Sequence, residues 1–122
     1  MNTFEKFYET FKLNKNKCTN LGSYFAERFL SKSSREELIS YRERLIDDNF
    51  KLIMKDEDLV KCVETFFEYD LNIAESARNT FMHRNTFLKR VDKIIELTGI
   101  DIRKFENAMM FKFLMIIYNL VD

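Results

Sequence analysis

Hydrophobic residues recur every three to four positions along most of the chain, the spacing that gathers them on one face of an α-helix. The first such face lies near the N-terminus and is aromatic, with Phe4, Phe7, Tyr8 and Phe11. We interpret this face as core or as a contact with a partner helix. Residues 14–20 are polar and are predicted to form a loop.

Three further helices are predicted before residue 71. Ser33 and Ser34 can cap the second of these, with Glu36 and Glu37 in its first turn. The last of the three begins after Asp56 and ends near Tyr69. Their apolar faces are, in order, Leu21, Tyr24, Phe25, Phe29 and Leu30; then Leu38, Tyr41, Leu45 and Ile46; then Leu59, Val63, Phe66 and Phe67.

Residues 72–99 show the pattern of two helices joined by a tight turn. Asn72 is a favoured N-cap residue, and Glu75 follows at the capping-box spacing. A polar break over residues 80–83 supplies the turn, and the second helix covers about residues 84–97. The inward-facing positions are predicted to be Ile73, Ala77 and Phe81 in the first helix and Phe87, Val91, Ile94 and Thr98 in the second.

Gly99 follows the second helix as a residue that can adopt positive φ. The last helix starts at about Ile102, where the apolar positions are Ile102, Phe105 and Met109. Residues 111–118 are then apolar nearly all round, with Lys112 as the single charge. A helix that is apolar on every side is buried on every side. We therefore expect the N-terminal helices to wrap it and a second subunit to cover it.

The chain has 122 residues, 2 glycines and no proline, so few of the residues that make turns and strand corners are present. This composition predicts an all-α fold of helices joined by short polar connections. The length fits one domain. We expect one compact unit, with an N-terminal helical segment over residues 1–55, for packing or dimerisation, and a helix-turn-helix region over residues 56–122.

Cys18 and Cys62 are interpreted as free thiols, although a disulfide between them is possible, because no secretion signal precedes them. Apolar stretches such as residues 113–118 are too short to cross a membrane. The expectation is a cytoplasmic protein without a membrane span. Its high content of Asn, Lys, Phe and Ile is typical of a low-GC bacterial source.

The net charge is zero, which by itself disfavours nucleic-acid binding, but the charge is unevenly distributed. Residues 78–93 hold five basic side chains against Asp92, a net charge of +4, and the remainder carries −4. A basic face on an acidic body could orient the protein on DNA while limiting indiscriminate binding.

The second helix of the motif has the features of a DNA-reading helix. Such helices present their N-terminal residues to base edges in the major groove. Arginine pairs bidentately with guanine and asparagine with adenine, whereas flanking basic residues suit phosphates. His83 is interpreted as a turn and capping residue and as a further candidate for a phosphate contact. The candidate DNA-binding residues are Arg78, His83, Arg84, Asn85, Thr86, Lys89, Arg90 and Lys93.

This stretch resembles the C-terminal helix-turn-helix domain of the PucR/CdaR-type bacterial transcriptional regulators. The resemblance covers about residues 58–120 and implies binding to double-stranded operator DNA as part of a homodimer. Leu88 stands where the family usually has a polar or basic residue, and Lys89 where an aromatic residue is common. The residues that carry the resemblance are Asn72, Ala77-Arg78, His83-Arg84-Asn85-Thr86, Arg90-Val91, Ile94, Glu96-Leu97-Thr98-Gly99 and Asp101.

Larger members of the family carry upstream sensing domains, and the first half of this chain is too short for one. The sequence therefore does not indicate whether a small-molecule effector binds. Leu88 and Ile95 lie off the inward face, where either the N-terminal helices cover them or they mark an interface.

No enzyme is predicted, because the single histidine belongs to a turn and no carboxylate pair or glycine-rich phosphate loop is present. Catalytic residues, metal ligands and cofactors are therefore not expected. A second hypothesis is a helical protein-interaction module that keeps a helix-turn-helix scaffold without binding DNA. The zero net charge and Leu88 favour it.

Overall fold

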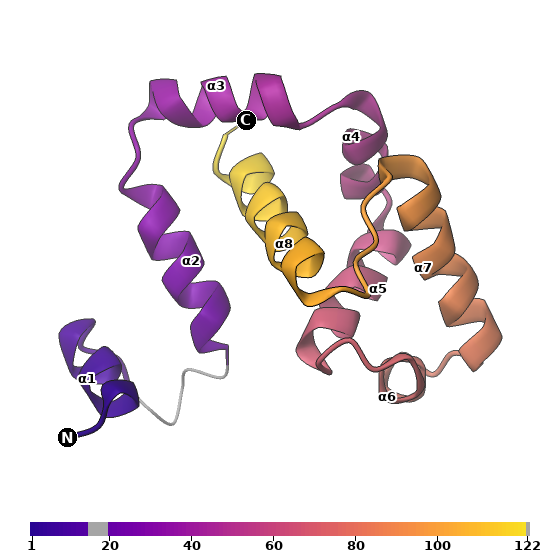
Figure 1. Cartoon of the computed structure of the whole chain (residues 1–122), viewed down its shortest axis with the longest axis horizontal. Helices are drawn as coiled ribbons and strands as arrows, with labels where there is room; N and C mark the ends of the chain where they lie inside the picture. The colour runs from indigo at the N-terminus through magenta and orange to yellow at the C-terminus, as the bar shows by residue number, and fades with distance from the viewer. Residues whose placement is uncertain (15–19, 122) are drawn as a thin grey trace.

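The described part of the chain, residues 1–14 and 20–121 of a computed structural model, consists of α-helices without strands (Figure 1). The all-α class predicted from the sequence is confirmed. Cys18 and most of the predicted loop over residues 14–20 lie outside the described residues. The helices are α1 (Thr3–Thr10), α2 (Leu21–Ser31), α3 (Arg35–Leu45), α4 (Asp48–Lys55), α5 (Glu57–Glu68), α6 (Ile73–Asn79), α7 (Arg84–Thr98) and α8 (Phe105–Leu120).

The starts of the helices are set by capping side chains. Each of the helices α1 to α7 follows a residue whose side chain accepts a hydrogen bond from a backbone N–H two or three positions later. Such bonds satisfy N–H groups that have no partner within the helix. Ser34 caps α3, as the sequence indicated, through a 3.1 Å bond from the Glu37 N–H.

Helix α4 was not predicted. Its cap is Asp47, whose carboxylate accepts a 2.9 Å hydrogen bond from the Phe50 N–H. Phe50 and Ile53 are its buried residues. A helix of 8 residues with two buried positions repeats its apolar pattern too few times to be recognised by periodicity.

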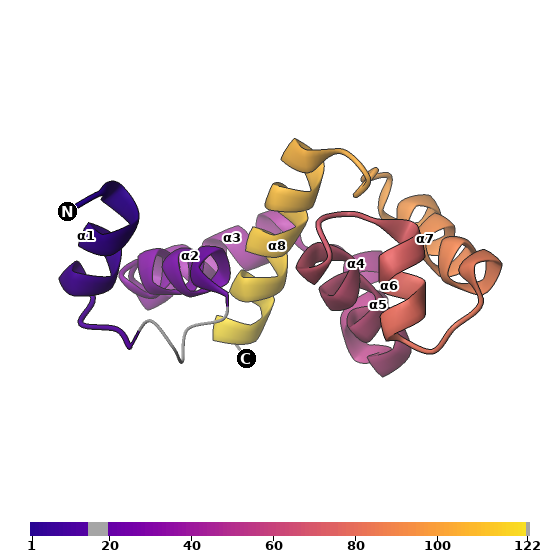
Figure 2. The same ribbon diagram turned by 90° about the horizontal axis from the view of Figure 1, so that it is seen from below.

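Helix α8 occupies the middle of the molecule, with α2 on one side and α4 and α5 on the other, while α3 runs across from the side of α2 to α4 (Figures 1 and 2). A continuous core cluster joins α4, α5, α7 and α8. The Phe111 ring of α8 lies 5.0 Å from the Phe50 ring, and the Phe66 ring lies 6.2 Å from the Phe87 ring of α7. The core is therefore formed by the facing sides of α4, α5, α7 and α8.

The contacts of α2 and α3 with α8 provide the wrap expected of the N-terminal helices. The predicted apolar face of α3 is wrong in part, because Tyr41 and Leu45 are exposed while Leu38 is buried. Arg42 instead lies on the side of α3 that contacts α8, and its guanidinium carbon is 4.9 Å from the centre of the Tyr118 ring. A cation over an aromatic face replaces the expected apolar contact.

The apolar face predicted for the start of the last helix is also wrong in part. Ile102 is buried, but Phe105 is 72% exposed and Met109 is 48% exposed. Helix α8 begins at Phe105, so Ile102 belongs to the preceding turn and does not share the helical phase of the other two residues. The inner face of α8 starts at Ala108 and Phe111.

The aromatic face of α1 packs on α2, at the end of the molecule far from α7 (Figure 1). The Phe7 and Phe25 rings lie 5.5 Å apart, and the Phe11 ring lies 6.0 Å from Tyr24. The interpretation of this face as a partner-helix contact is thus confirmed. Phe4 and Phe25 remain exposed, because no further helix covers this pair.

Candidate nucleic-acid interface

Helix α6 starts where the sequence predicted. The Asn72 side chain accepts a 2.9 Å hydrogen bond from the Glu75 N–H. The Glu75 carboxylate forms an ion pair with Arg78, with 2.9 Å between Oε1 and Nη1. Ala77 is buried against the core, whereas Arg78 is exposed. One predicted DNA-binding residue is therefore already paired with a carboxylate on its own helix.

The turn between α6 and α7 corrects the predicted position of Phe81, which was expected to face inward. Helix α6 ends at Asn79, and Phe81 takes the left-handed conformation with φ of 54°. The Met82 N–H bonds to the Ala77 carbonyl at 2.9 Å, and the Phe81 N–H bonds to the Arg78 carbonyl at 3.2 Å. This is the Schellman pattern that ends a helix. Because the helix stops before it, Phe81 points away from the core and is 99% exposed.

His83 is the N-cap of α7. Its Nδ1 accepts a hydrogen bond of 3.2 Å from the Asn85 N–H. The interpretation of His83 as a turn and capping residue is confirmed. The imidazole is exposed and lies directly before Arg84, the first residue of the helix.

The inner face of α7 is fixed by packing. Phe87, Val91 and Ile94 are completely buried, as predicted, and α7 contacts α4, α5 and α6. Ile95 packs partly buried against the core, and Leu88 is half-buried. A helix held on its inner side by three others presents its opposite side in a defined orientation.

The structure brings Arg84, Asn85 and Thr86 together on the exposed first turn of α7, next to His83. Lys89 and Lys93 continue the exposed side of the helix. The positive charge is concentrated toward the N-terminal half, because the exposed residues Asp92 and Glu96 follow in the second half. The basic end of α7 therefore coincides with the positive end of its helix dipole.

Arg90 differs from the other predicted basic residues because it is half-buried. Its charge lowers the pKa of Cys62, but burial of the thiol has the larger and opposite effect, and the resulting pKa is raised to about 11. Cys62 is thus a buried, protonated thiol at neutral pH, and it is free, as the sequence predicted. Arg90 lies on the side of α7 that faces α5, at the edge of the candidate interface.

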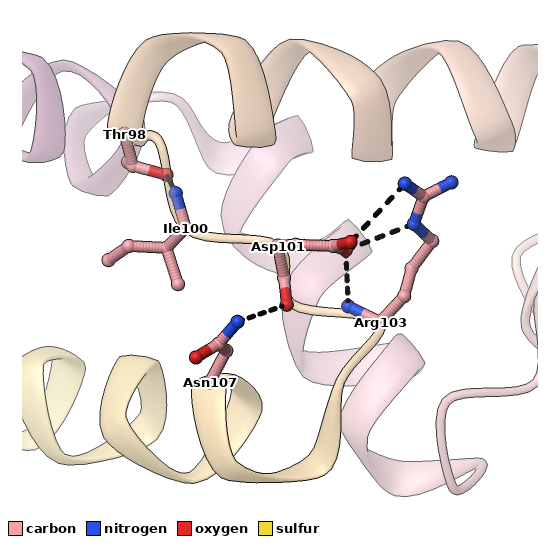
Figure 3. Close-up of polar contacts among 5 residues, drawn as sticks. All are labelled: Thr98, Ile100, Asp101, Arg103 and Asn107. Atoms are coloured by element: carbon pink, nitrogen blue, oxygen red, sulfur yellow. Dashed lines mark hydrogen bonds and ion pairs between the residues drawn. The ribbon is translucent and has the colours of Figure 1, made fainter.

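A polar linkage holds the end of α7 to the start of α8 (Figure 3). Gly99 has φ of 71° and ends α7 with a 2.7 Å bond from its N–H to the Ile95 carbonyl. The Asp101 carboxylate accepts hydrogen bonds from the Arg103 side chain and backbone N–H, and the Asn107 side chain donates to the Asp101 carbonyl at 3.1 Å. The hydrogen bonds from Arg103 lower the pKa of Asp101. This linkage was not predicted, although Gly99 and Asp101 were among the noted residues.

Residues 59–117 match the family described as the PucR C-terminal helix-turn-helix domain. They form a PucR C-terminal helix-turn-helix domain. The match runs from α5 to near the end of α8 and lies within the range over which the sequence resemblance was seen. The PucR-type domain thus includes the capped α6, the turn, α7 and the polar linkage. Helices α1 to α4 lie outside the match; α2 and α3 contact α8, and α4 contacts α5 and α7.

A curated relative is similar to this chain over part of its length. The uncharacterized protein YxkF of Bacillus subtilis (strain 168) is 33% identical over 73 residues, which cover 59% of this chain and 25% of the relative. The chain therefore spans about a quarter of the length of the relative that it matches. No solved structure matches the chain.

Neither the PucR-type domain nor the rest of the described chain contains a group of side chains suited to a metal ion. No cluster of three or more His, Cys, Asp or Glu side chains in the described part of the chain could hold a metal ion. Within the same residues, no helix is both long and apolar enough to span a membrane. The candidate interface of the PucR-type domain consists of basic and polar side chains of α6, α7 and their turn.

Proposed function

We propose that the chain is a sequence-specific DNA-binding transcriptional regulator that reads the major groove with α7. The observation that carries the proposal is the exposed group Arg84, Asn85 and Thr86 on the first turn of α7, within a helix-turn-helix domain. Reading helices of this motif place their N-terminal residues against base edges. The buried inner face of α7 supplies the fixed orientation that such reading requires.

The proposed roles follow from the chemistry of each side chain. Arg84 would donate two hydrogen bonds to a guanine, and Asn85 would pair with an adenine. Thr86 and Lys89 extend the reading surface along the same half of the helix. Asp92 and Glu96 would repel the phosphate backbone, so we assign the base contacts to the N-terminal half of α7.

The remaining predicted residues suit the phosphate backbone. Arg78 lies on α6, Arg90 and Lys93 lie further along α7, and His83 stands at the start of its first turn. Arg78 would need to give up part of its ion pair with Glu75 to reach a phosphate. We therefore expect Arg78 to contribute less than Lys93, which forms no ion pair with any residue in the described part of the chain.

We further propose that the chain binds as a homodimer. Two-fold symmetric proteins of this motif bind half-sites spaced about 10 base pairs apart, one helical turn of DNA. A dimer is expected to scatter light with twice the monomer mass of 14.8 kDa. A monomer mass at micromolar concentration, with and without DNA, would contradict this part of the proposal.

The test is selection of bound duplexes from a random pool with the wild type, Arg84→Ala and the control Arg44→Ala. Arg44 is an exposed arginine of α3, distant from the interface. The wild type and Arg44→Ala are expected to enrich one motif, and Arg84→Ala to relax one base position at a cost of about 1–3 kcal/mol. Equal enrichment by all three proteins would exclude Arg84 from base reading.

Salt dependence separates phosphate contacts from base contacts. The affinity for DNA should fall steeply with salt, and Lys93→Ala should reduce the slope of log K against log salt by about one. The same variant should weaken all sequences alike. An affinity that does not respond to salt would argue against DNA binding altogether.

A second candidate function is a helical protein-interaction module. The observation that favours it is the group of large exposed apolar side chains on α2 and α8, which includes Phe25, Phe29, Phe105 and Met109. An apolar interface of this kind gains affinity from buried area and is insensitive to salt. Failure of the wild type to enrich any duplex at low salt would favour this candidate.

A further inference from the structure

Phe81 stands out among the residues of the described chain because its conformation and its exposure are both unfavourable. It is 99% exposed and takes φ of 54°, a region that non-glycine side chains rarely adopt. The position after a helix end where this conformation occurs is usually occupied by glycine or asparagine. A phenylalanine there strains the backbone and leaves an aromatic ring in water.

The other residues with positive φ show how the chain normally handles this conformation. Lys12 and Asp70 end α1 and α5 in the same way, but both side chains are polar. Leu71 is apolar, but it packs partly buried against the core. Gly99 has no side chain to strain. Among these five residues, Phe81 is the one with a side chain that is both apolar and exposed to water, so neither hydration nor packing compensates for its unfavourable backbone conformation.

The location of Phe81 indicates what could cover its ring. It precedes Arg84 by three residues and lies in the turn that leads into the reading helix, at the end of the molecule opposite α1 (Figures 1 and 2). Helix α6 cannot bury it, because the chain has already left the helix at Thr80. Phe81 is thus an exposed apolar side chain in the turn that immediately precedes the first turn of α7.

We propose that Phe81 packs its ring against the C5-methyl group of a thymine when α7 occupies the major groove. The inference rests on the proposed DNA-binding function and adds an apolar reading contact to it. The thymine methyl is the apolar feature of the major-groove edge, and phenylalanine is one of the side chains that contact it. The contacted thymine lies next to the base pair read by Arg84.

The first experiment compares duplex selection by the wild type, Phe81→Asn and the control Phe29→Ala. Asparagine tolerates the left-handed conformation, so Phe81→Asn should be at least as stable as the wild type in thermal unfolding. Phe29 is another exposed phenylalanine, 67% exposed on α2, and is far from α7. We expect Phe81→Asn alone to lose preference for thymine at one position adjacent to the Arg84 position.

The second experiment removes the methyl group from the DNA rather than the ring from the protein. Replacing that thymine by deoxyuridine should weaken binding of the wild type about four-fold, the effect of exposing one methyl-sized apolar group. Binding of Phe81→Asn should not change. Because the wild type reports the effect by itself, the result does not depend on the behaviour of the variant.

Two results would overturn the inference while leaving the proposed function intact. One is a wild type that selects a motif but is indifferent to deoxyuridine at every thymine of that motif. The other is a Phe81→Asn protein that keeps the wild-type motif and affinity. A wild type that enriches no duplex at low salt would overturn both proposals, so the two failures are distinguishable.

Discussion

Phenylalanines on the inner helix faces of one region of the molecule are buried, whereas those of a second region are exposed. Phe81 and Phe105, which lie at helix ends and are exposed, are not part of this comparison. In the region from α4 to α8, Phe50, Phe66, Phe87 and Phe111 are at most 2% exposed. In the N-terminal helices, Phe4 is 51% and Phe29 is 67% exposed. Both regions show apolar residues at helical spacing in the sequence. The difference is that α7 and α8 are covered from several sides, whereas α1 contacts α2 at the edge of the molecule (Figure 1).

This contrast shows what an amphipathic pattern can and cannot specify. The pattern identifies which face of a helix avoids water, but burial also requires enough neighbouring helices to cover that face. Ring contacts between α1 and α2 remove part of the aromatic surface from water without forming a closed core. We therefore expect matched substitutions in the two regions to differ strongly in their effect on stability.

The largest difference is expected for the pair Phe87→Ala and Phe29→Ala. Removing the fully buried Phe87 ring leaves a cavity and should lower the free energy of unfolding by about 3–5 kcal/mol. Removing the exposed Phe29 ring should change it by less than about 0.5 kcal/mol. Chemical denaturation followed by circular dichroism measures both values.

Protein concentration is the control for this pair. If a second copy covers the N-terminal helices in solution, the cost of Phe29→Ala should grow as the concentration rises. A concentration-independent cost comparable to that of Phe87→Ala would contradict the contrast between the two regions.

The two glycines provide a second matched pair. Gly99 has φ of 71°, whereas Gly22 is in the first turn of α2, and an added Cβ would meet no atom within 4 Å at either position. The backbone therefore decides the outcome. Gly99→Ala should destabilise the protein by about 1–2 kcal/mol. Gly22→Ala should be neutral or stabilise it by up to about 1 kcal/mol, because alanine favours the helix.

Thermal unfolding of the two glycine variants is sufficient to check this pair. Gly99→Asn should recover part of the lost stability, since asparagine tolerates positive φ. Equal melting temperatures for Gly99→Ala and the wild type would mean that the end of α7 is not part of the cooperative unit.

Helix caps give a third pair with a smaller effect. The Asn72 and Asn2 side chains accept similar bonds, of 2.9 Å from the Glu75 N–H and 2.8 Å from the Glu5 N–H. Asn72→Ala should cost about 1 kcal/mol of global stability. Asn2→Ala should instead increase local opening of α1 with little effect on global stability, because α1 lies at the edge. Amide hydrogen exchange distinguishes the two outcomes, and equal global costs would contradict the prediction.

The sequence predicted the parts of the fold that depend on local chemistry. The helix-turn-helix was found because Asn72, the inward positions of α7 and Gly99 each have a cause that is local in the chain. Phe81 was misplaced because its apolar character continued the helical pattern, while the Schellman bonds that end α6 depend on backbone geometry. Helix α4 and the exposure of Phe105 were missed because they depend on helix length and on distant packing.

The sequence predicted which residues the candidate site contains, but not which of them pair with other side chains or are partly buried. The exposed first turn of α7 is the start of the second helix of the motif, so its residues could be named from the sequence. The ion pair of Arg78 with Glu75 and the half-buried position of Arg90 depend on side-chain geometry that spacing does not specify. Both differences concern phosphate candidates, and neither affects the group at Arg84.

The smallest expected effect concerns the segment between α7 and α8, which contains a charge-assisted hydrogen bond from Arg103 to Asp101. The ring contacts described between α1 and α2 are uncharged. The pKa of Asp101 is lowered by hydrogen bonds from Arg103. A lowered carboxyl pKa means that the bond contributes stability above the pKa of the unfolded chain and loses it as the pH falls through the folded pKa. Asp101→Asn should therefore destabilise the protein slightly at neutral pH, and the difference from the wild type should disappear in acid.

Unfolding measured at several pH values tests this, with Arg103→Gln as the matched variant. A difference between wild type and Asp101→Asn that stays constant into acid would mean that the Asp101 charge does not stabilise the segment between α7 and α8.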